Sequence, residues 1–276
     1  MADSCNNTSR ANSGLLLIGH GTRDPRGLAE ARLLADKVQA ICPDVIVGLC
    51  FLEMATPDIA AGVKRLVHAG VRKIRVVPLM LLAAGHVKQD IPAAVEAATQ
   101  GFGDLAIGEV EIGYCPPLGC HDHVVTWSER RYGETVGNAD EAPADRVPAK
   151  ETLLVLVARG NRDAEAQEEW LEFVENRRRP SDSPTIKPAF LAMAEPLLDE
   201  VLANAATGGH RRIVIQPHLL FAGQLLTRLQ SQVSTFASSH PRQQWLVAQH
   251  LGPSQLLAEA VARIASNRQC HNSRTS

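Results

Sequence analysis

Short apolar runs alternate along the chain with longer segments in which apolar residues recur at helical spacing. Such runs, followed by turn residues, are typical of buried strands. In the first half they occupy residues 15–18, 45–52, 73–80 and 106–114. Strands that alternate with helices at this spacing predict an α/β fold, with a parallel sheet covered by helices on both faces.

Local signals predict where the helices of this half begin and end. Thr56 as N-cap, followed by Pro57 at the first helical position, predicts a helix that lasts to about His68. Residues 81–88 are expected to form a loop, and Asp90 is expected to cap the helix that follows it.

The second half of the chain repeats the landmarks of the first half. Phe51 recurs as Phe190 and Pro78 recurs as Pro217, each 139 positions later. The stretch 154–163 is a degraded copy of 15–24 at the same offset. Several landmarks at one constant offset indicate a tandem duplication of one α/β unit.

The duplication sets the expected domain boundaries. Residues 133–150 follow a helix predicted over 120–131, lack apolar periodicity and are rich in Gly, Pro, Ala and acids, which indicates a linker. Two lobes are therefore expected at 14–132 and 151–266. The polar ends, 1–13 and 267–276, are predicted to be disordered tails.

Composition narrows the classes of function. With a formal net charge of −2, the chain has no general attraction for nucleic acid or an anionic membrane. The first 13 residues lack the apolar stretch of a signal peptide, and no apolar run approaches the ~18 residues of a membrane span. The six cysteines are scattered and form no disulfide framework of the secreted type. These features predict a cytoplasmic protein.

Three side chains suited to metal binding or proton transfer follow the first three predicted strands: His20, Glu53 and His86. The carboxyl ends of parallel strands share one edge of a sheet, so these side chains can converge there. Two imidazoles and a carboxylate suit a borderline divalent metal such as iron, cobalt, nickel or zinc, and they can equally act as general bases. The corresponding residues of the second half are Arg159, Ala192 and Gln224. We therefore expect one active site, on the first lobe.

The residues around these side chains form three longer motifs: His20-Gly21-Thr22-Arg23, Phe51-Leu52-Glu53, and the run 78–92 with its Gly85-His86-Val87 and Asp90-Ile91-Pro92 elements. Together they resemble the sirohydrochlorin chelatase family, the CbiX/SirB type of class II chelatase, in its long form with two fused lobes. The resemblance covers the first half throughout and the second half more faintly.

The resemblance implies two flavodoxin-like lobes that face each other across a cleft, and insertion of Fe²⁺, Co²⁺ or Ni²⁺ into sirohydrochlorin without ATP. His20 and His86 would bind the metal and accept the pyrrole protons, with Glu53 as a helper. The substrate carries many carboxylates, for which Arg23 and Lys88 are candidate anchors. Gly21 and Gly85 are placed beside them at the substrate. The internal duplication predicts a monomer that acts as its own pseudo-dimer.

Other readings of the sequence remain open beside this one. A metal or tetrapyrrole carrier would use the same histidines without turnover. A phosphohydrolase with a nucleophilic His usually has an Arg directly before it, where this chain has Gly19. Cys115, Cys120, His121 and His123 could form a second metal site, although their spacing fits no zinc-finger pattern. His218 is expected to be a structural residue or to line the cleft.

Overall fold

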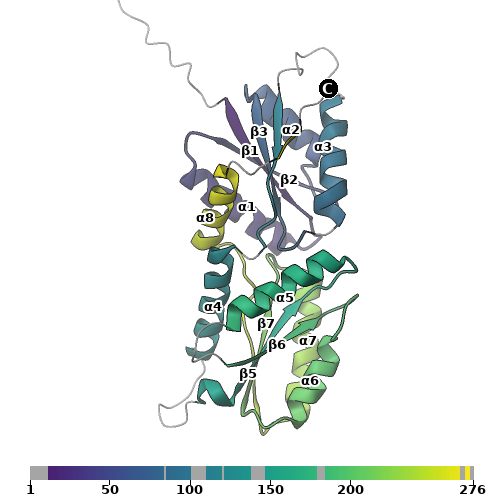
Figure 1. Ribbon diagram of the computed structural model, residues 1–276, viewed down its shortest axis with the longest axis vertical. Helices are drawn as coiled ribbons and strands as arrows, with labels where there is room; N and C mark the ends of the chain where they lie inside the picture. Colours follow the sequence, from purple (N-terminus) through teal and green to yellow (C-terminus); the bar gives the residue numbers. More distant parts are fainter. Residues whose placement is uncertain are drawn as a thin grey trace, which may run out of the picture.

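The computed structural model describes residues 12–83, 85–100, 110–119, 121–137, 147–178, 184–267 and 271–273, and the side chains of all of these except His86 and 271–273. Two α/β lobes lie one above the other along the long axis of the molecule (Figure 1). The predicted α/β fold with two tandem lobes is confirmed. In the described ranges, no helix combines the length and apolar character needed to cross a bilayer.

The first lobe is built on a sheet with strand order β2-β1-β3-β4-β9. Its parallel strands are β1 (Ser13–Gly19), β2 (Ile46–Phe51), β3 (Lys73–Leu79) and β4 (Glu111–Tyr114). Its helical segments are α1 (Pro25–Ile41), α2 (Ile59–His68), the π-helix η1 (His86–Asp90) and α3 (Ile91–Gln100).

The last strand, β9 (His271–Ser273), pairs antiparallel with β4. The expectation of a disordered tail over 267–276 is therefore wrong for these three residues. Pairing with β4 covers an edge strand whose backbone groups would otherwise have no strand partner on that side. At the other end, the expectation of a disordered tail over 1–13 is wrong for Ser13, which is the first residue of β1, and residues 1–11 lie outside the described ranges.

The second lobe repeats this plan with strand order β6-β5-β7-β8. Its strands, all parallel, are β5 (Thr152–Ala158), β6 (Thr185–Phe190), β7 (Arg212–Pro217) and β8 (Gln244–Val247). Its sequence also forms a short 3₁₀ helix, η4 (Ala149–Glu151), and the helices α5 (Ala164–Arg178), α6 (Leu198–Thr207), α7 (Gln224–Ser239) and α8 (Gln255–Ser266).

Fine details of the backbone repeat between the lobes as well. Gly21 and Gly160 have φ values of +97° and +86°, and Met54 and Met193 have φ values of 60° and 62°. The peptide bonds Thr56–Pro57 and Glu195–Pro196 are both cis. The duplication seen in the sequence is therefore a duplication of backbone geometry at the strand ends.

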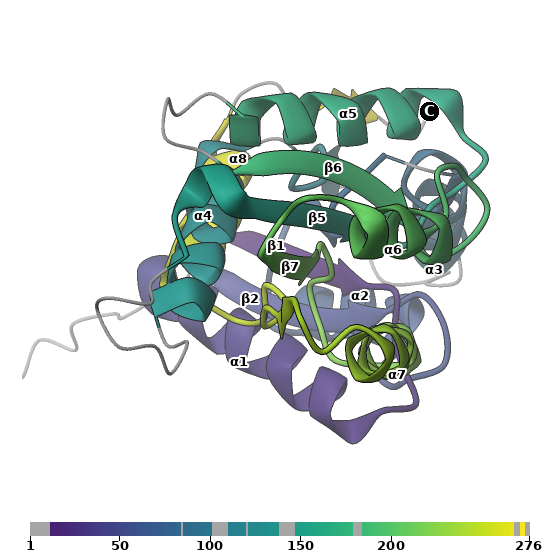
Figure 2. The ribbon, with the colours of Figure 1, turned by 90° about the horizontal axis from the view of Figure 1, so that it is seen from below.

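Alternating residues of each central strand enter different cores. In β5, Leu154 and Leu156 face α5, whereas Leu153 and Val155 face α6 and α7 on the opposite side of the sheet (Figure 2). Trp170 of α5 is fully buried in the first of these cores. That core is continuous between the lobes, because side chains of both central strands contribute to it.

The lobes exchange their last helices. Helix α4 (Asp122–Gly137), which ends the first half of the sequence, lies against α5 and β8 of the second lobe. Helix α8, which ends the second half, lies against α1 and β3 of the first lobe (Figure 1). The expected boundaries at 132 and 151 divide the sequence, but the lobes in space are not contiguous pieces of chain.

Helix α4 also runs further than expected. Gly133, which was expected to open the linker, lies inside α4. Tyr132 and Val136 pack against the core that joins the lobes, and Arg131 pairs with Glu134 along the helix at 3.1 Å. These contacts extend the helix through a segment with little apolar periodicity. Residues 138–146 of the expected linker lie outside the described ranges.

Two expected helix starts are also wrong. Asp58, rather than Thr56, is the N-cap of α2, and its side chain accepts a hydrogen bond from the Ala61 amide at 2.8 Å. Pro57 precedes the helix, because its carbonyl accepts a hydrogen bond from the Phe51 amide at 2.9 Å. The end of the expected loop 81–88 is helical from η1, which continues directly into α3, so Asp90 lies within a helical segment instead of capping one.

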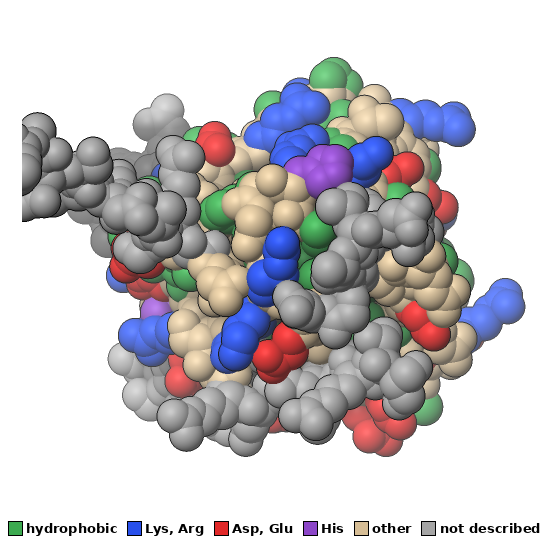
Figure 3. Space-filling view, turned by 90° about the horizontal axis from the view of Figure 1, so that it is seen from above, with side chains coloured by type: hydrophobic (Ala, Val, Ile, Leu, Met, Phe, Trp, Pro, Cys, Tyr) green, Lys and Arg blue, Asp and Glu red, His purple; other side chains and the backbone are tan. Residues whose placement is uncertain are grey.

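The face of the first lobe farthest from the second carries charge of both signs. Figure 3 shows Lys and Arg side chains beside Asp and Glu side chains near its centre. One such pair joins Lys73 of β3 to Glu111 of β4 at 3.3 Å. The two lobes meet at the opposite end of these strands (Figure 1).

Candidate active site

His20 stands at the carboxyl end of the central strand β1, and two backbone hydrogen bonds join this end to the residues that follow β2. The Leu52 amide donates to the Gly19 carbonyl at 2.9 Å, and the Glu53 amide donates to the His20 carbonyl at 3.0 Å. A Cβ on Gly21 would lie 1.8 Å from the Glu53 carbonyl oxygen, so only glycine permits this approach.

This close approach brings the side chains of His20 and Glu53 together. The His20 Nε2 lies 3.0 Å from the Glu53 Oε1, and the two side chains are 31% and 49% exposed. A carboxylate in contact with an imidazole orients the ring and increases its basicity. The pair can therefore hold a metal ion or take up a proton, and it remains accessible to a ligand.

His86 is the first residue of η1, which follows β3. Strand β3 lies beside β1, with Leu79 opposite Gly19, so the segment after β3 leaves the sheet next to His20. Val87, the residue after His86, lines a small pocket that His20 also lines. The His86 side chain lies outside the described part of the structure, and its approach to His20 stays a prediction.

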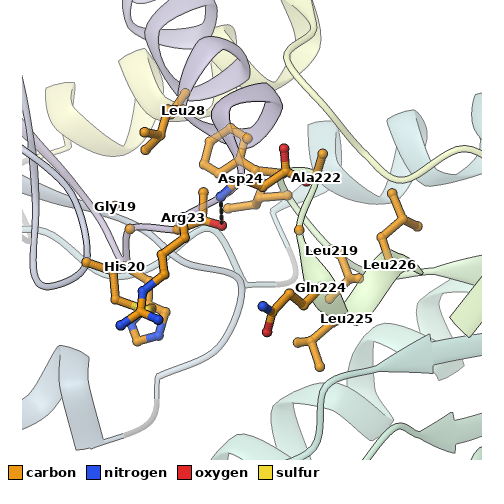
Figure 4. A pocket seen from close by; sticks show the side chains of 18 of the residues that line it. Gly19, His20, Arg23, Asp24, Leu28, Leu219, Ala222, Gln224, Leu225 and Leu226 are labelled. Atoms are coloured by element: carbon orange, nitrogen blue, oxygen red, sulfur yellow. Dashed lines mark hydrogen bonds between the residues drawn. The ribbon is translucent and has the colours of Figure 1, made fainter. Parts of the chain in front are cut away.

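Two cavities open between the lobes, and His20 lines both. The larger has a volume of about 770 Å³ and lies between the start of α1 and the segment from Leu219 to Leu226. Figure 4 shows His20 and Arg23 on one side of it and Gln224 on the other. The smaller, of about 240 Å³, is lined mainly by apolar side chains such as Leu81.

Arg159, at the end of β5, also lines both cavities. It occupies the position that His20 holds in the first lobe, so the two lobes present different chemistry to one cleft. From the sequence, Arg159 is only the residue that replaces His20 in the second half. Its place in the cleft depends on how the two lobes pack against each other, which the sequence pattern does not reveal.

The two candidate anchors for substrate carboxylates differ in their surroundings. Arg23 is exposed and lines the larger cavity. The Lys88 Nζ, in contrast, lies 2.6 Å from the Glu165 Oε2 and 3.1 Å from the Asp163 Oδ2, both in the second lobe. Hydrogen bonds to Glu165 and then Asp163 raise the pKa of Lys88. The Lys88 ammonium is therefore engaged between the lobes rather than directed to a free anion.

The two glycines placed at the substrate also differ. Gly21 is required by the close approach described above, whereas a Cβ on Gly85 would meet nothing within 4 Å. Nothing in the packing thus demands glycine at position 85.

The described donors of the Cys115 group are not arranged to hold a metal ion. Cys115 is buried, and the His121 and His123 rings lie 5.3 Å apart edge to face. The His123 Nδ1 is 3.6 Å from Glu259 of α8, across the α4–α8 contact. Cys120 lies outside the described ranges. Within those ranges, no group of three or more His, Cys, Asp or Glu side chains is arranged to hold a metal ion.

His218, directly after β7, is buried against the rings of Trp170 and Phe173, with centroid distances of 4.9 and 4.2 Å. It also lines the smaller cavity. Burial, with a contribution from the nearby Arg177, lowers the pKa of His218 to about 3. The folded chain therefore holds this imidazole neutral.

His218 is predicted to make stability depend on pH. The unfolded chain takes up a proton near pH 6.5, and the folded chain does not until about pH 3, so acidification through this window favours unfolding. The slope is at most about 1.4 kcal/mol per pH unit. The variant His218→Leu has the same residue type as the corresponding position of the first lobe, Leu79. Between pH 7 and pH 5, its free energy of unfolding should fall by about 2 kcal/mol less than that of the wild type. Urea unfolding at both pH values measures this, and an equal pH dependence in both proteins would contradict it.

Comparisons with known proteins identify the family of this chain. The family model described as CbiX matches residues 14–135 and 153–267, which is most of both lobes. The chain belongs to the CbiX family. The resemblance read from the sequence motifs is thereby confirmed.

Relatives of this CbiX chain include two that match most of it, across both lobes. A sirohydrochlorin cobaltochelatase of Priestia megaterium is 27% identical over 86% of this chain and 74% of its own. A sirohydrochlorin ferrochelatase of the same organism is 27% identical over 86% of this chain and 84% of its own. The structure described as SirB from Bacillus subtilis with Fe³⁺ has a TM-score of 0.79 and 25% identity, and covers 92% of this chain and 96% of that one. These relatives are named for cobalt or iron, so the expectation of nickel gains no support.

Proposed function

We propose that this chain inserts Fe²⁺ or Co²⁺ into sirohydrochlorin without ATP. The observation that carries the proposal is the His20–Glu53 contact of 3.0 Å in a two-lobed member of the CbiX family, in which His20 lines two interlobe cavities. The larger cavity, at about 770 Å³, lies within the usual range of ligand pockets, roughly 300–1,000 Å³.

The chemistry explains why these residue types suit the reaction. A tetrapyrrole loses two N–H protons as the metal enters, and a neutral imidazole beside a carboxylate is a suitable acceptor. The metal must arrive on ligands that release it, and imidazole with carboxylate meets this need better than a thiolate cage. We assign these tasks to His20 and His86, with Glu53 orienting His20. Arg23 would contact a substrate carboxylate.

In this proposal, the two lobes have different roles. The first lobe carries the reacting residues, and the second closes the cleft with Arg159 in place of a histidine. Because one chain supplies both walls, a monomer is sufficient for activity.

The test is an absorbance time course of the purified chain with sirohydrochlorin and Co²⁺ or Fe²⁺, without ATP. We expect insertion well above the rate without enzyme. Tetrapyrrole binding without faster insertion would contradict the enzyme proposal and favour the carrier alternative. Gln224→Ala, which removes the second-lobe counterpart of His86, should retain insertion if there is one active site.

A further inference from the structure

The segment that carries His86 is held in place by the second lobe. Lys88, two residues after His86 in η1, contacts Glu165 at 2.6 Å and Asp163 at 3.1 Å. At the other end of the segment, the Ala83 amide donates to the Glu169 Oε2 at 2.8 Å. Three acidic residues at and after the start of α5 therefore contact the few residues on either side of His86.

The reverse contact, from the first lobe to the second, is made by Glu30, whose carboxylate also lies 3.0 Å from the His250 Nε2. The Ala222 amide donates to the Glu30 Oε2 at 2.7 Å, which repeats the contact between Ala83 and Glu169 at the 139-residue offset. The ion pairs of Lys88, however, are not repeated. The position that corresponds to Lys88, aligned through Gly85-His86 and Gly223-Gln224, is the buried Leu226.

Asp24 and Asp163, which correspond to each other in the two lobes, also have different partners. Asp24, the first-lobe counterpart of Asp163, pairs with Arg26 of its own helix at 2.8 Å. Asp163 caps α5, accepting from the Glu165 and Ala166 amides at 3.1 and 3.3 Å, and also contacts Lys88. Among the described residues, the ion pairs of Asp163 and Glu165 thus reach the segment that carries His86, whereas the corresponding segment with Gln224 has Leu226 in place of the lysine.

We propose that Asp163 and Glu165 are positioning residues, which act through Lys88 to fix the backbone of η1 and thereby the place of His86 at the reacting edge. This inference rests on the proposed function, because it assumes that His86 takes part in metal insertion. It gives the second lobe a task in the reaction, although that lobe has Arg159, Ala192 and Gln224 where the first lobe has His20, Glu53 and His86.

The contact is suited to positioning more than to overall stability. The side chains of Lys88, Asp163 and Glu165 are 35%, 27% and 76% exposed, and ion pairs at such exposure add little to the free energy of folding. A reacting group displaced by about 1 Å, in contrast, can slow a reaction by as much as roughly 100-fold. Loss of the two ion pairs of Lys88 should therefore lower kcat more than it lowers the free energy of unfolding.

The test compares the double variant Asp163→Asn/Glu165→Gln with the wild type. Asn still caps a helix, so α5 keeps its start while the charges are removed. Glu168→Gln, an exposed change in the same helix, is the matched control. Glu165→Gln alone is measured in parallel as a milder change. The readouts are kcat and KM for Co²⁺ insertion, and hydrogen exchange of the backbone amides of 85–90.

We expect exchange in 85–90 to be roughly 2- to 10-fold faster in the double variant. We expect kcat to fall roughly 10-fold with KM for sirohydrochlorin little changed. Glu168→Gln should match the wild type in both. Unchanged exchange, or faster exchange with unchanged kcat, overturns the positioning role while an active wild type keeps the proposed function intact. An inactive wild type instead overturns the proposed function and this role with it.

Discussion

His20→Ala is expected to lower the rate of metal insertion by roughly 10²- to 10⁴-fold, which is the usual contribution of a general base. His20 contacts Glu53 and lines both interlobe cavities, so its removal takes away a base and a metal ligand at the centre of the cleft. The fold should persist, because the side chain is about one-third exposed and adds little to the core.

Initial rates of Co²⁺ insertion at saturating sirohydrochlorin measure this effect, with urea unfolding of each variant to verify folding. His68→Ala, at the exposed end of α2, is the matched control and should insert metal at the wild-type rate. The insertion rate of Glu53→Gln should lie between those of His20→Ala and His68→Ala, since an amide still accepts a hydrogen bond but carries no charge. If His20→Ala retains wild-type insertion, His20 is not the base.

Gly21→Ala and Gly160→Ala are expected to destabilise the chain by a similar amount but to differ in activity. Both glycines have positive φ, and a Cβ on each would lie 1.8 Å from a carbonyl oxygen, that of Glu53 or Ala192. Left-handed backbone strain and the steric clash together predict a loss of roughly 2–5 kcal/mol in each variant. Only Gly21→Ala also displaces the residue that contacts His20.

Denaturant unfolding and insertion rates at a temperature where both variants are folded separate the two effects. We expect insertion to fall by about 10-fold or more in Gly21→Ala, with a much smaller change in Gly160→Ala. Equal losses of activity in the two variants would mean that the His20–Glu53 geometry is not what limits the reaction.

The sequence predicted β1, β2, β3 and the duplication well, because all of these depend on local pattern. It did not predict β9, and residues 106–109 of the fourth predicted strand lie outside the described ranges. Buried runs such as 15–18 have few alternatives to a strand, and one constant offset reveals a repeat whatever its exact fold. Helix starts were less predictable. Thr56 and Asp58 are both good capping residues, and the choice between them depends on the course of the chain between Phe51 and Pro57.

The candidate site was only partly predictable for a similar reason. His20 and Glu53 follow neighbouring strands, so their meeting at one sheet edge is a consequence of topology. The partners of Lys88 lie 75 and 77 positions further along the chain, in the other lobe. Neither spacing nor composition reveals that contact, because it depends on how the two sheets face each other.

The exchange of α4 and α8 has a consequence for how such a chain can change over time. A half cut from the chain would leave behind a helix that covers part of its own core, so neither half is expected to be stable alone. In an assembly of two identical subunits, each substitution appears at both related positions. Here the two halves pack together through the exchanged helices, but they belong to one chain. A substitution in one half therefore leaves the corresponding position of the other half unchanged. A histidine could thus be replaced by Arg159 on one wall of the cleft while His20 was kept on the other.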